Sequence, residues 1–141
     1  KMGISNYDIS SILATSVSQR LVRRICKHCA QERDFSESEI NMIHKIGEKY
    51  HVEFDLKDKK TYDPVGCKHC NQTGYYDRIG IFEILNINEE VRELIANDAS
   101  SIEIRKRALE TGYKPLVVDG IQKVINGITT LEEINNKLII Y

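Results

Sequence analysis

The chain has 141 residues, of which 41% are hydrophobic and 29% charged, and its formal net charge is −1. This composition can build a core and excludes disorder of the whole chain, and the length suits one modest domain or the end of a larger protein. The near-zero charge argues against a dedicated nucleic-acid or anionic-membrane binder. No apolar run approaches the roughly 18 residues of a membrane span, and no secretory signal is recognised, so we expect an intracellular chain.

The first predicted element is an amphipathic helix over residues 8–25. Apolar residues recur there mostly at steps of three and four, and Asp8 stands at the expected N-cap. Three basic residues at i, i+3 and i+4 would share one side of its last turns, near the negative end of the helix dipole. They are Arg20, Arg23 and Arg24.

The four cysteines occur in two short motifs of identical sequence, Cys-Lys-His-Cys at 26–29 and again at 67–70. Two residues between thiolates allow one tight turn to direct both sulfur atoms at the same ion. Two such turns supply the tetrahedral four-thiolate shell that a structural zinc ion prefers, although the middle segment exceeds the roughly 15–20 residues of a zinc ribbon. The predicted metal ligands are Cys26, Cys29, Cys67 and Cys70.

Other interpretations of the cysteines are weaker. A disulfide framework requires an oxidising compartment, and a thioredoxin-like redox pair requires only one C-x2-C motif. Four thiolates leave no open position for water, so a catalytic zinc is not expected, and His28 and His69 are expected to face solvent rather than to replace a sulfur. The neighbouring basic residues either offset the negative charge of a zinc–thiolate centre or form an ordinary solvated surface. They are Lys27, Lys68, Arg23 and Arg24.

The segment between the two motifs is predicted to contain one helix. Ser36 and Glu39 form a capping-box pattern, and apolar residues at helical spacing continue the helix from about 37 to 50. Residues 51–66 are predicted to form a strand fragment and a loop, with a turn at Asp63-Pro64. Residues 30–66 would therefore be an insertion whose ends a metal ion holds together, which restricts the unfolded chain.

After the second motif we predict a strand over 78–85 and then a helical bundle from residue 88 onward. The expected helices cover 89–97, about 101–111, 116–126 and about 131–139, with Asn88 as the first N-cap. Capping boxes begin two of them, at Ser100 with Glu103 and at Thr130 with Glu133, and Gly112 and Gly127 suit helix C-termini. The adjacent glutamates at 89–90 and 132–133 are explained by capping and the helix dipole rather than by acid–base chemistry.

The motifs of common catalytic sites are missing from the sequence. It contains no phosphate-binding G-x4-G-K-[S/T] loop and no G-x-G-x-x-G, G-x-S-x-G or H-E-x-x-H motif. We therefore predict no catalytic residue in this chain.

Specific residues do resemble one protein family. These are the run Ser18-Gln19-Arg20-Leu21-Val22-Arg23-Arg24-Ile25-Cys26, the run Cys70-x2-Thr73-Gly74-Tyr75-x2-Arg78-x-Gly80-Ile81-x-Glu83, and the ending Gly127-Ile128-Thr129-Thr130-x-Glu132-Glu133. Together they resemble the C-terminal part of the GspE/PilB secretion ATPases, the motors of bacterial type II secretion and type IV pilus assembly. Two positions depart from the family pattern: Ser18 replaces Ala, and Asp77 replaces a Gly before Arg78. The Asp weakens any claim that the backbone at this position needs the freedom of glycine.

The resemblance implies an α/β fragment, mostly helical, cut from a longer motor. Residues 1–25 would be the C-terminal part of a RecA-like ATPase domain and 26–70 a tetracysteine zinc-binding insertion. Residues 71–87 would form a strand associated with the ATPase domain, and 88–141 a helical C-terminal subdomain. Retraction motors of the same superfamily typically lack the four cysteines, which favours assembly or secretion.

The resemblance also implies the partners and cofactors of the parent protein. It would be a cytoplasmic homohexamer, peripheral to the inner face of the cell membrane, that works on an inner-membrane platform protein and binds ATP and Mg²⁺. The fragment itself would hold only structural Zn²⁺, lack the phosphate-binding loop, have no transmembrane segment, bind no nucleic acid and be inactive as an enzyme. Four arginines would serve the subunit interface or anchor strands: Arg20, Arg23, Arg24 and Arg78. The alternative is a stand-alone zinc-ribbon module that binds nucleic acid or protein.

Overall fold

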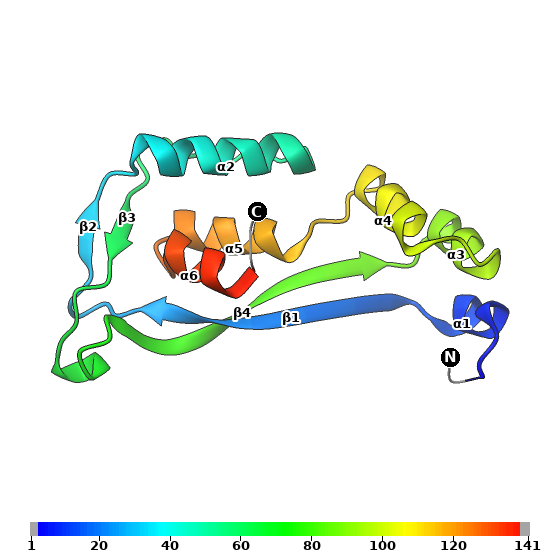
Figure 1. Cartoon of the computed structure of the whole chain (residues 1–141), viewed down its shortest axis with the longest axis horizontal. Helices are drawn as coiled ribbons and strands as arrows, with labels where there is room; N and C mark the ends of the chain where they lie inside the picture. The colour runs from blue at the N-terminus through cyan, green and yellow to red at the C-terminus, as the bar shows by residue number, and fades with distance from the viewer. Residues whose placement is uncertain (1–2, 139–141) are drawn as a thin grey trace. The chain divides into compact units, whose positions relative to one another are not determined.

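The computed structural model describes residues 3–138 and confirms a mixed α/β fold for them (Figure 1). This part of the chain contains six α-helices, four strands and one short 3-10 helix. It divides into two compact units: the first combines the N-terminal residues up to Ser18 with Glu83–Pro115, and the second combines Gln19–Phe82 with the residues from Leu116 onward. The four segments predicted above concern the relation to a longer protein, and they stay a prediction.

The predicted helix over 8–25 is wrong in its larger part. Helix α1 covers only Asn6–Ile12, and strand β1 covers Thr15–Ile25. Ser5 is the N-cap, because its hydroxyl accepts a hydrogen bond from the Asp8 backbone N–H at 3.1 Å, so Asp8 lies inside the first turn instead. The β-branched residues of the segment favour a strand, and pairing with a partner strand overrides the helical spacing of its apolar residues. The arginines at 20, 23 and 24 therefore lie on a strand.

The partner of β1 is strand β4, Tyr75–Asn86, which begins earlier than predicted and runs in the opposite direction (Figure 1). Backbone hydrogen bonds join Ala14 to Ile87 and Cys26 to Gly74, so β4 has one residue more than β1 between them. Asp77 has a φ of 71°, in the left-handed region, which together with the extra residue indicates a β-bulge. The expectation for Asp77 is thus wrong: the backbone does adopt the conformation that favours Gly, and Asp is among the few other residues that tolerate it.

The first unit contains α1, helix α3 (Glu89–Ala96) and helix α4 (Ser101–Glu110). Helix α3 packs against both of the others, with Val91 and Ala108 buried between them. The predicted caps are confirmed here: Asn88 accepts from the Val91 N–H, and Ser100 with Glu103 forms a complete capping box.

The second unit holds the main hydrophobic core. Helices α5 (Leu116–Ile125) and α6 (Leu131–Leu138) lie between α2 (Glu37–Tyr50) and the adjoining parts of β1 and β4 (Figure 1). Each of these elements contributes fully buried side chains to one cluster. They include Val22, Ile43, Ile81, Ile121 and Ile134, all 0% exposed.

Helix α5 ends at Ile125, and Gly127 forms the turn that terminates it, as predicted. The N–H groups of Gly127 and Ile128 return to the carbonyls of Val124 and Lys123, and Gly127 has a φ of 67°. This is the Schellman arrangement, in which Gly takes the left-handed position without steric cost. The turn directs residues 128–130 back along β1.

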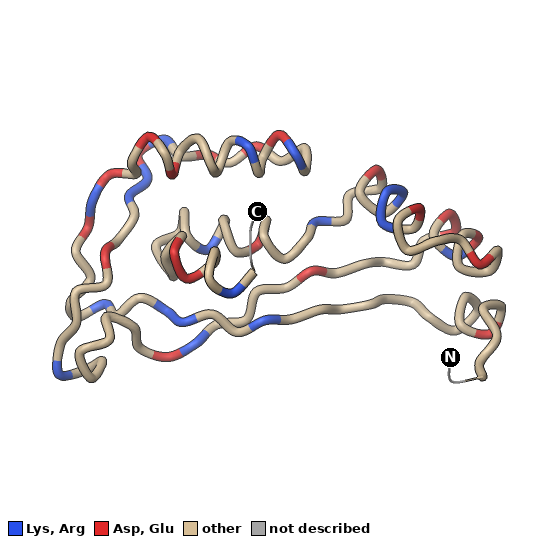
Figure 2. Tube along the Cα trace, in the orientation of Figure 1, with Lys and Arg blue, Asp and Glu red and all other residues tan. Residues whose placement is uncertain are grey.

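The predicted insertion between the cysteine motifs has more structure than expected. Strands β2 (Gln31–Arg33) and β3 (Thr61–Asp63) pair antiparallel, with Gln31 opposite Asp63. They connect the two Cys-Lys-His-Cys motifs to α2. Both acidic and basic residues occur along this ribbon (Figure 2). Arg33 pairs with Asp63 at 2.9 Å and with Glu39 at 2.7 Å, so one guanidinium joins both strands to the capping box of α2.

No helix among residues 3–138 combines the length and the hydrophobicity that crossing a membrane requires.

The ion pair at the start of α2 predicts a pH dependence of stability. The Arg33 side chain and the Ser36 cap lower the pKa of Glu39 from its ordinary value of 4.5 to about 2, although burial acts in the opposite direction. Because the folded pKa is the lower one, this stabilisation is present above about pH 4.5 and is lost as the pH falls toward 2. Glu39→Gln should therefore destabilise the chain at pH 6 and destabilise it much less near pH 2.5.

Urea unfolding followed by circular dichroism at both pH values measures this difference. Glu37→Gln, an exposed change in the same helical turn, is the matched control and should cost little at either pH. An equal loss for Glu39→Gln at both pH values would contradict the proposed ion-pair origin.

Candidate metal centre

Each Cys-Lys-His-Cys motif forms a tight turn, here called a knuckle. In the first knuckle the carbonyl of Cys26 accepts hydrogen bonds from the N–H groups of Cys29 and Ala30. The second contains the 3-10 helix η1, Lys68–Cys70, and the Cys67 carbonyl accepts from the N–H groups of Cys70 and Gln72. Both turns point their two sulfur atoms to one side, as the C-x2-C spacing requires.

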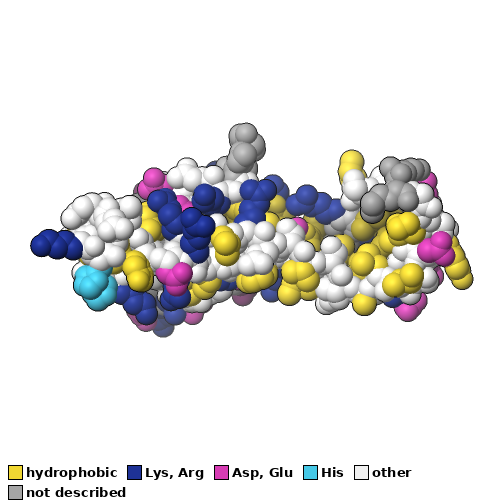
Figure 3. Space-filling model, turned by 90° about the horizontal axis from the view of Figure 1, so that it is seen from below, with side chains coloured by type: hydrophobic (Ala, Val, Ile, Leu, Met, Phe, Trp, Pro, Cys, Tyr) yellow, Lys and Arg dark blue, Asp and Glu magenta, His cyan; other side chains and the backbone are white. Residues whose placement is uncertain are grey.

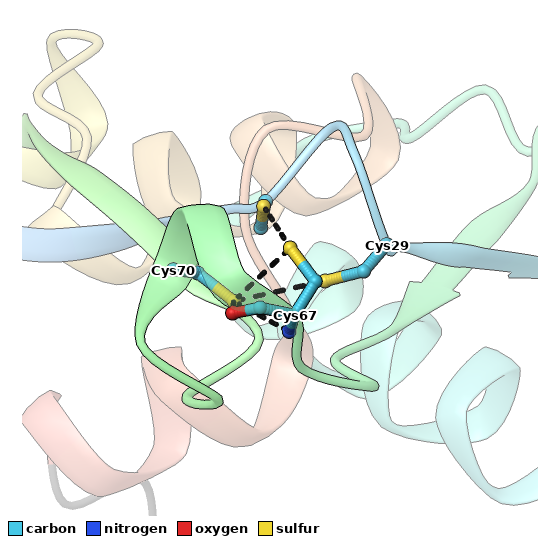
Figure 4. A group of neighbouring side chains, drawn as sticks. Cys29, Cys67 and Cys70 are labelled. Atoms are coloured by element: carbon cyan, nitrogen blue, oxygen red, sulfur yellow. Dashed lines mark hydrogen bonds between the residues drawn. The ribbon is translucent and has the colours of Figure 1, made fainter.

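The structure brings all four predicted ligands together. Their sulfur atoms lie within 4.8 Å of one another, and Figure 4 shows the labelled side chains of Cys29, Cys67 and Cys70 directed toward a common centre. Corresponding cysteines of the two knuckles face each other, with sulfur–sulfur distances of 3.9 Å for Cys26–Cys67 and 3.8 Å for Cys29–Cys70. Within the second knuckle, Cys67 and Cys70 are 3.7 Å apart.

These distances fit a tetrahedral zinc site. With Zn–S bonds of about 2.3 Å, tetrahedral geometry separates the sulfur atoms by about 3.8 Å. A disulfide would require about 2.05 Å, and the four cysteines are free thiols in the structure. The residues present could therefore hold a metal ion without rearrangement.

Backbone N–H groups donate hydrogen bonds to the sulfur atoms of Cys70 and Cys29. Cys70 accepts from Cys67 at 3.1 Å and from Gly74 at 3.2 Å, and Cys29 accepts from Gly66 at 3.3 Å. Burial raises the pKa of Cys29 to about 12. Burial acts in the same direction on Cys70, but the N–H groups of Cys67 and Gly74 lower its pKa to about 6. Such donors stabilise thiolates, the form of cysteine that binds metal.

Gly74 joins the two knuckles through its backbone. Its N–H group donates to the Cys70 sulfur, and its carbonyl accepts from the Cys26 N–H at 2.9 Å. Its φ is 75°, and a Cβ here would lie only 2.5 Å from Pro64. Glycine is therefore required twice over, for backbone conformation and for space.

The remaining motif residues lie on the outside of the knuckles. His28 and His69 are exposed, as expected, and stack on each other with ring centroids 4.1 Å apart. Lys27 and Lys68 are exposed as well. The two knuckles thus meet with like residue opposite like, at the sulfur atoms and at the imidazoles.

The four predicted interface arginines all lie on β1 or β4 within the second unit. Figure 3 shows Lys and Arg side chains gathered over this part of the two strands. The Arg20 guanidinium donates to the Lys137 carbonyl at 2.9 Å. Among residues 3–138, no carboxylate forms a salt bridge with Arg24 or Arg78. Their role at a subunit interface is untested and stays a prediction.

Arg23 has a partner that the sequence did not reveal. The Glu133 carboxylate, 1% exposed, binds the Arg23 guanidinium at 2.5 Å and its backbone N–H at 3.0 Å. The predicted capping box at Thr130 and Glu133 is only half formed. The Thr130 hydroxyl accepts a hydrogen bond from the Glu133 N–H, but the Glu133 carboxylate binds Arg23. Despite its burial, the contact with Arg23 lowers the pKa of Glu133. No local signal distinguishes Glu133 from an ordinary first-turn glutamate.

A sequence profile of the family described as "Type II/IV secretion system protein" matches residues 1–136. The chain belongs to this family. The resemblance noted in the sequence is thereby confirmed.

Several members of the type II/IV secretion family are similar over nearly the whole chain. The type IV pilus assembly ATPase PilB of Thermus thermophilus is 37% identical over 134 residues, which are 95% of this chain and 14% of that protein. The type II secretion system protein E of Aeromonas hydrophila is 37% identical over 94% of this chain and 25% of its own length. The type IV pilus assembly ATPase TfpB of Acinetobacter baylyi is 31% identical, with 94% and 22% covered. The chain thus spans at most about a quarter of the length of these relatives.

The double requirement for glycine at position 74 predicts a strong effect of Gly74→Ala. The left-handed conformation alone costs an L-residue about 1–2 kcal/mol, and the overlap with Pro64 adds to that. Gly112→Ala is a matched control, because Gly112 has a φ of 94° but nothing within 4 Å of an added Cβ. Urea unfolding should show a larger loss for Gly74→Ala, together with weaker metal retention. Equal losses for both variants would contradict the close approach to Pro64.

Proposed function

We propose that this chain is the zinc-stabilised C-terminal portion of a hexameric ATPase that powers type IV pilus assembly or type II secretion. The observation that carries the proposal is the four-sulfur cluster, with tetrahedral spacing, in a chain that matches the secretion family along its length. The named relatives are pilus assembly ATPases and type II secretion proteins. The cysteines favour those two processes over pilus retraction.

The metal in this proposal is a structural Zn²⁺ held by Cys26, Cys29, Cys67 and Cys70. Zinc supplies a closed tetrahedral cross-link and no reactive site, because four thiolates leave no position for water. The N–H groups of Gly66, Cys67 and Gly74 stabilise the thiolates. Lys27 and Lys68 lie beside a centre whose formal charge is about −2, and they offset part of it.

The chemistry of ATP belongs, in this proposal, to parts of the longer protein outside this chain. Residues 1–25 and 71–87 would join its RecA-like domain, 26–70 would be the zinc-binding insertion, and 88–141 the helical subdomain. The guanidinium groups of Arg24 and Arg78, on β1 and β4, suit contacts with a neighbouring subunit of a homohexamer. The assembled motor would work in the cytoplasm, at the inner face of the membrane, on a platform protein.

Metal content is the direct test of the zinc centre. The chain purified under reducing, chelator-free conditions should contain one zinc per molecule, measured by elemental analysis. Cys67→Ser should abolish this and lower the Tm by roughly 10 °C, because metal binding and folding are coupled. Lys68→Ser, an exposed change in the same turn, should keep the metal. A metal-free chain, or an unchanged Tm for Cys67→Ser, would refute the proposal.

The motor function is tested separately, with the longer protein. It should hydrolyse ATP, whereas the 141-residue chain alone should show no turnover above background, since we expect the phosphate-binding loop elsewhere. Cys67→Ser in the chromosomal copy should abolish either surface pili or extracellular secretion, and the process that is lost identifies the machine. Turnover by the chain alone, or a variant that retains both processes, would contradict the assignment. Salt-sensitive micromolar binding to a generic DNA duplex would favour the alternative of a nucleic-acid module.

A further inference from the structure

We propose that Glu133 is a positioning residue for the metal centre: it holds the strand ends from which both knuckles extend, so metal binding and docking of α6 stabilise each other. The inference rests on the zinc centre proposed above and adds a role that local capping does not require. It is built entirely within the second unit, from the contacts of one buried carboxylate.

The Glu133 carboxylate uses both oxygens on a single residue of β1. Oε1 accepts from the Arg23 backbone N–H at 3.0 Å, and Oε2 accepts from Nε and Nη2 of the same residue at 2.9 and 2.5 Å. The glutamate is 1% exposed and the Arg23 side chain is 45% exposed, so the carboxylate is shielded from water while the guanidinium also reaches the surface. An anion on α6 therefore fixes both the main chain and the side chain of Arg23.

The contact with Arg23 is continued along β1 to the first knuckle. The Thr129 hydroxyl donates to the Arg23 carbonyl at 2.8 Å, and the Ile25 N–H donates to the Ile128 carbonyl at 2.9 Å. The next residue is Cys26, whose N–H binds Gly74. The last residues of β1 are thus held by the segment that begins α6.

The same arginine reaches the strand that leaves the second knuckle. Its guanidinium carbon lies 4.0 Å from the centre of the Tyr75 ring, a cation–π contact, and the Tyr75 hydroxyl shares a 2.8 Å hydrogen bond with Thr130. Tyr75 directly follows Gly74, whose N–H donates to the Cys70 sulfur. One glutamate therefore supports both strand ends.

The support of the two strand ends affects metal binding, because each close pair of sulfur atoms has one cysteine from each knuckle. The Cys26–Cys67 and Cys29–Cys70 distances of 3.9 and 3.8 Å depend on the relative placement of the β1 and β4 ends. Releasing Arg23 loosens that placement, and metal bound across it opposes the release. Such coupling is reciprocal: the factor by which docked α6 raises metal affinity is the factor by which metal stabilises docking.

Glu133→Gln tests the inference with an almost isosteric change that removes the charge and turns an amide N–H toward the donors of Arg23. Glu132→Gln, the exposed neighbour in the same turn, is the matched control. Zinc affinity is measured by competition with a chromophoric chelator, and Co²⁺ substitution reports the tetrathiolate geometry in the visible spectrum. We expect Glu133→Gln to weaken zinc binding roughly tenfold, as supporting residues around metal ligands do, and Glu132→Gln to change it less than twofold.

The outcomes separate the coupling from the zinc centre itself. If the unsubstituted chain takes up no metal, the zinc centre fails, and the coupling fails with it. If the unsubstituted chain binds zinc and Glu133→Gln unfolds more easily but keeps the same zinc affinity and Co²⁺ spectrum, the zinc centre stands and the coupling is refuted. Glu133 is then only an anchor of α6.

A second measurement needs no variant and covers the case in which Glu133→Gln does not fold. Hydrogen exchange of the unsubstituted chain, with zinc bound and after its removal by chelator, reports the opening of α6 directly. We expect the exchange of α6 amides to accelerate roughly tenfold on metal removal, matching the change in affinity. Unchanged protection of α6 in a chain that loses its metal would overturn the proposal.

Discussion

Four sulfur atoms within 4.8 Å of one another close a long loop of the chain, and the second unit is arranged around that closure. The ribbon of β2 and β3 begins at the cysteine cluster and leads to α2. Helix α2 places Ile43 and Ile46 in the core. The loop therefore is not an appendage of the fold. It leaves the core at the cysteines and returns to it through a helix, so the cysteine cluster and the apolar core constrain the same segment from two ends.

Local signals in the sequence were sufficient for much of this structure. The capping boxes at Ser36 and Ser100 and the glycine at 127 each act within one turn, and the structure has helix ends at these positions. The paired C-x2-C spacing likewise needed no knowledge of distant residues to indicate one cluster. In each case the residues that make the interaction are close together in the sequence or identical in type.

The errors concern interactions between distant segments. Residues 15–25 have apolar positions that suit a helix, and only pairing with β4 decides for a strand. Glu133 has the pattern of a first-turn glutamate, and only Arg23, at the other end of the chain, gives its buried carboxylate an ion pair. At Asp77 the absence of glycine misled, because the bulge depends on the register between β1 and β4 rather than on the residue itself. Register and long-range partners cannot be deduced from local periodicity.

The order of the strands also has a consequence for how fast this chain folds. Backbone hydrogen bonds at the two ends of β1 join it to segments far along the chain: Ala14 to Ile87, Cys26 to Gly74, and Ile25 to Ile128. Contacts between residues so far apart in the sequence require long loops to close. The chain loses this conformational entropy before the core contacts form, which slows folding. A metal ion that bound Cys26 and Cys67 early in folding would shorten the loops that must still close for β1 to pair with its partners. On the proposed zinc centre, the cysteines would then also act on the rate at which the native topology is reached, and the supply of metal during synthesis would be a kinetic factor as well as a structural one.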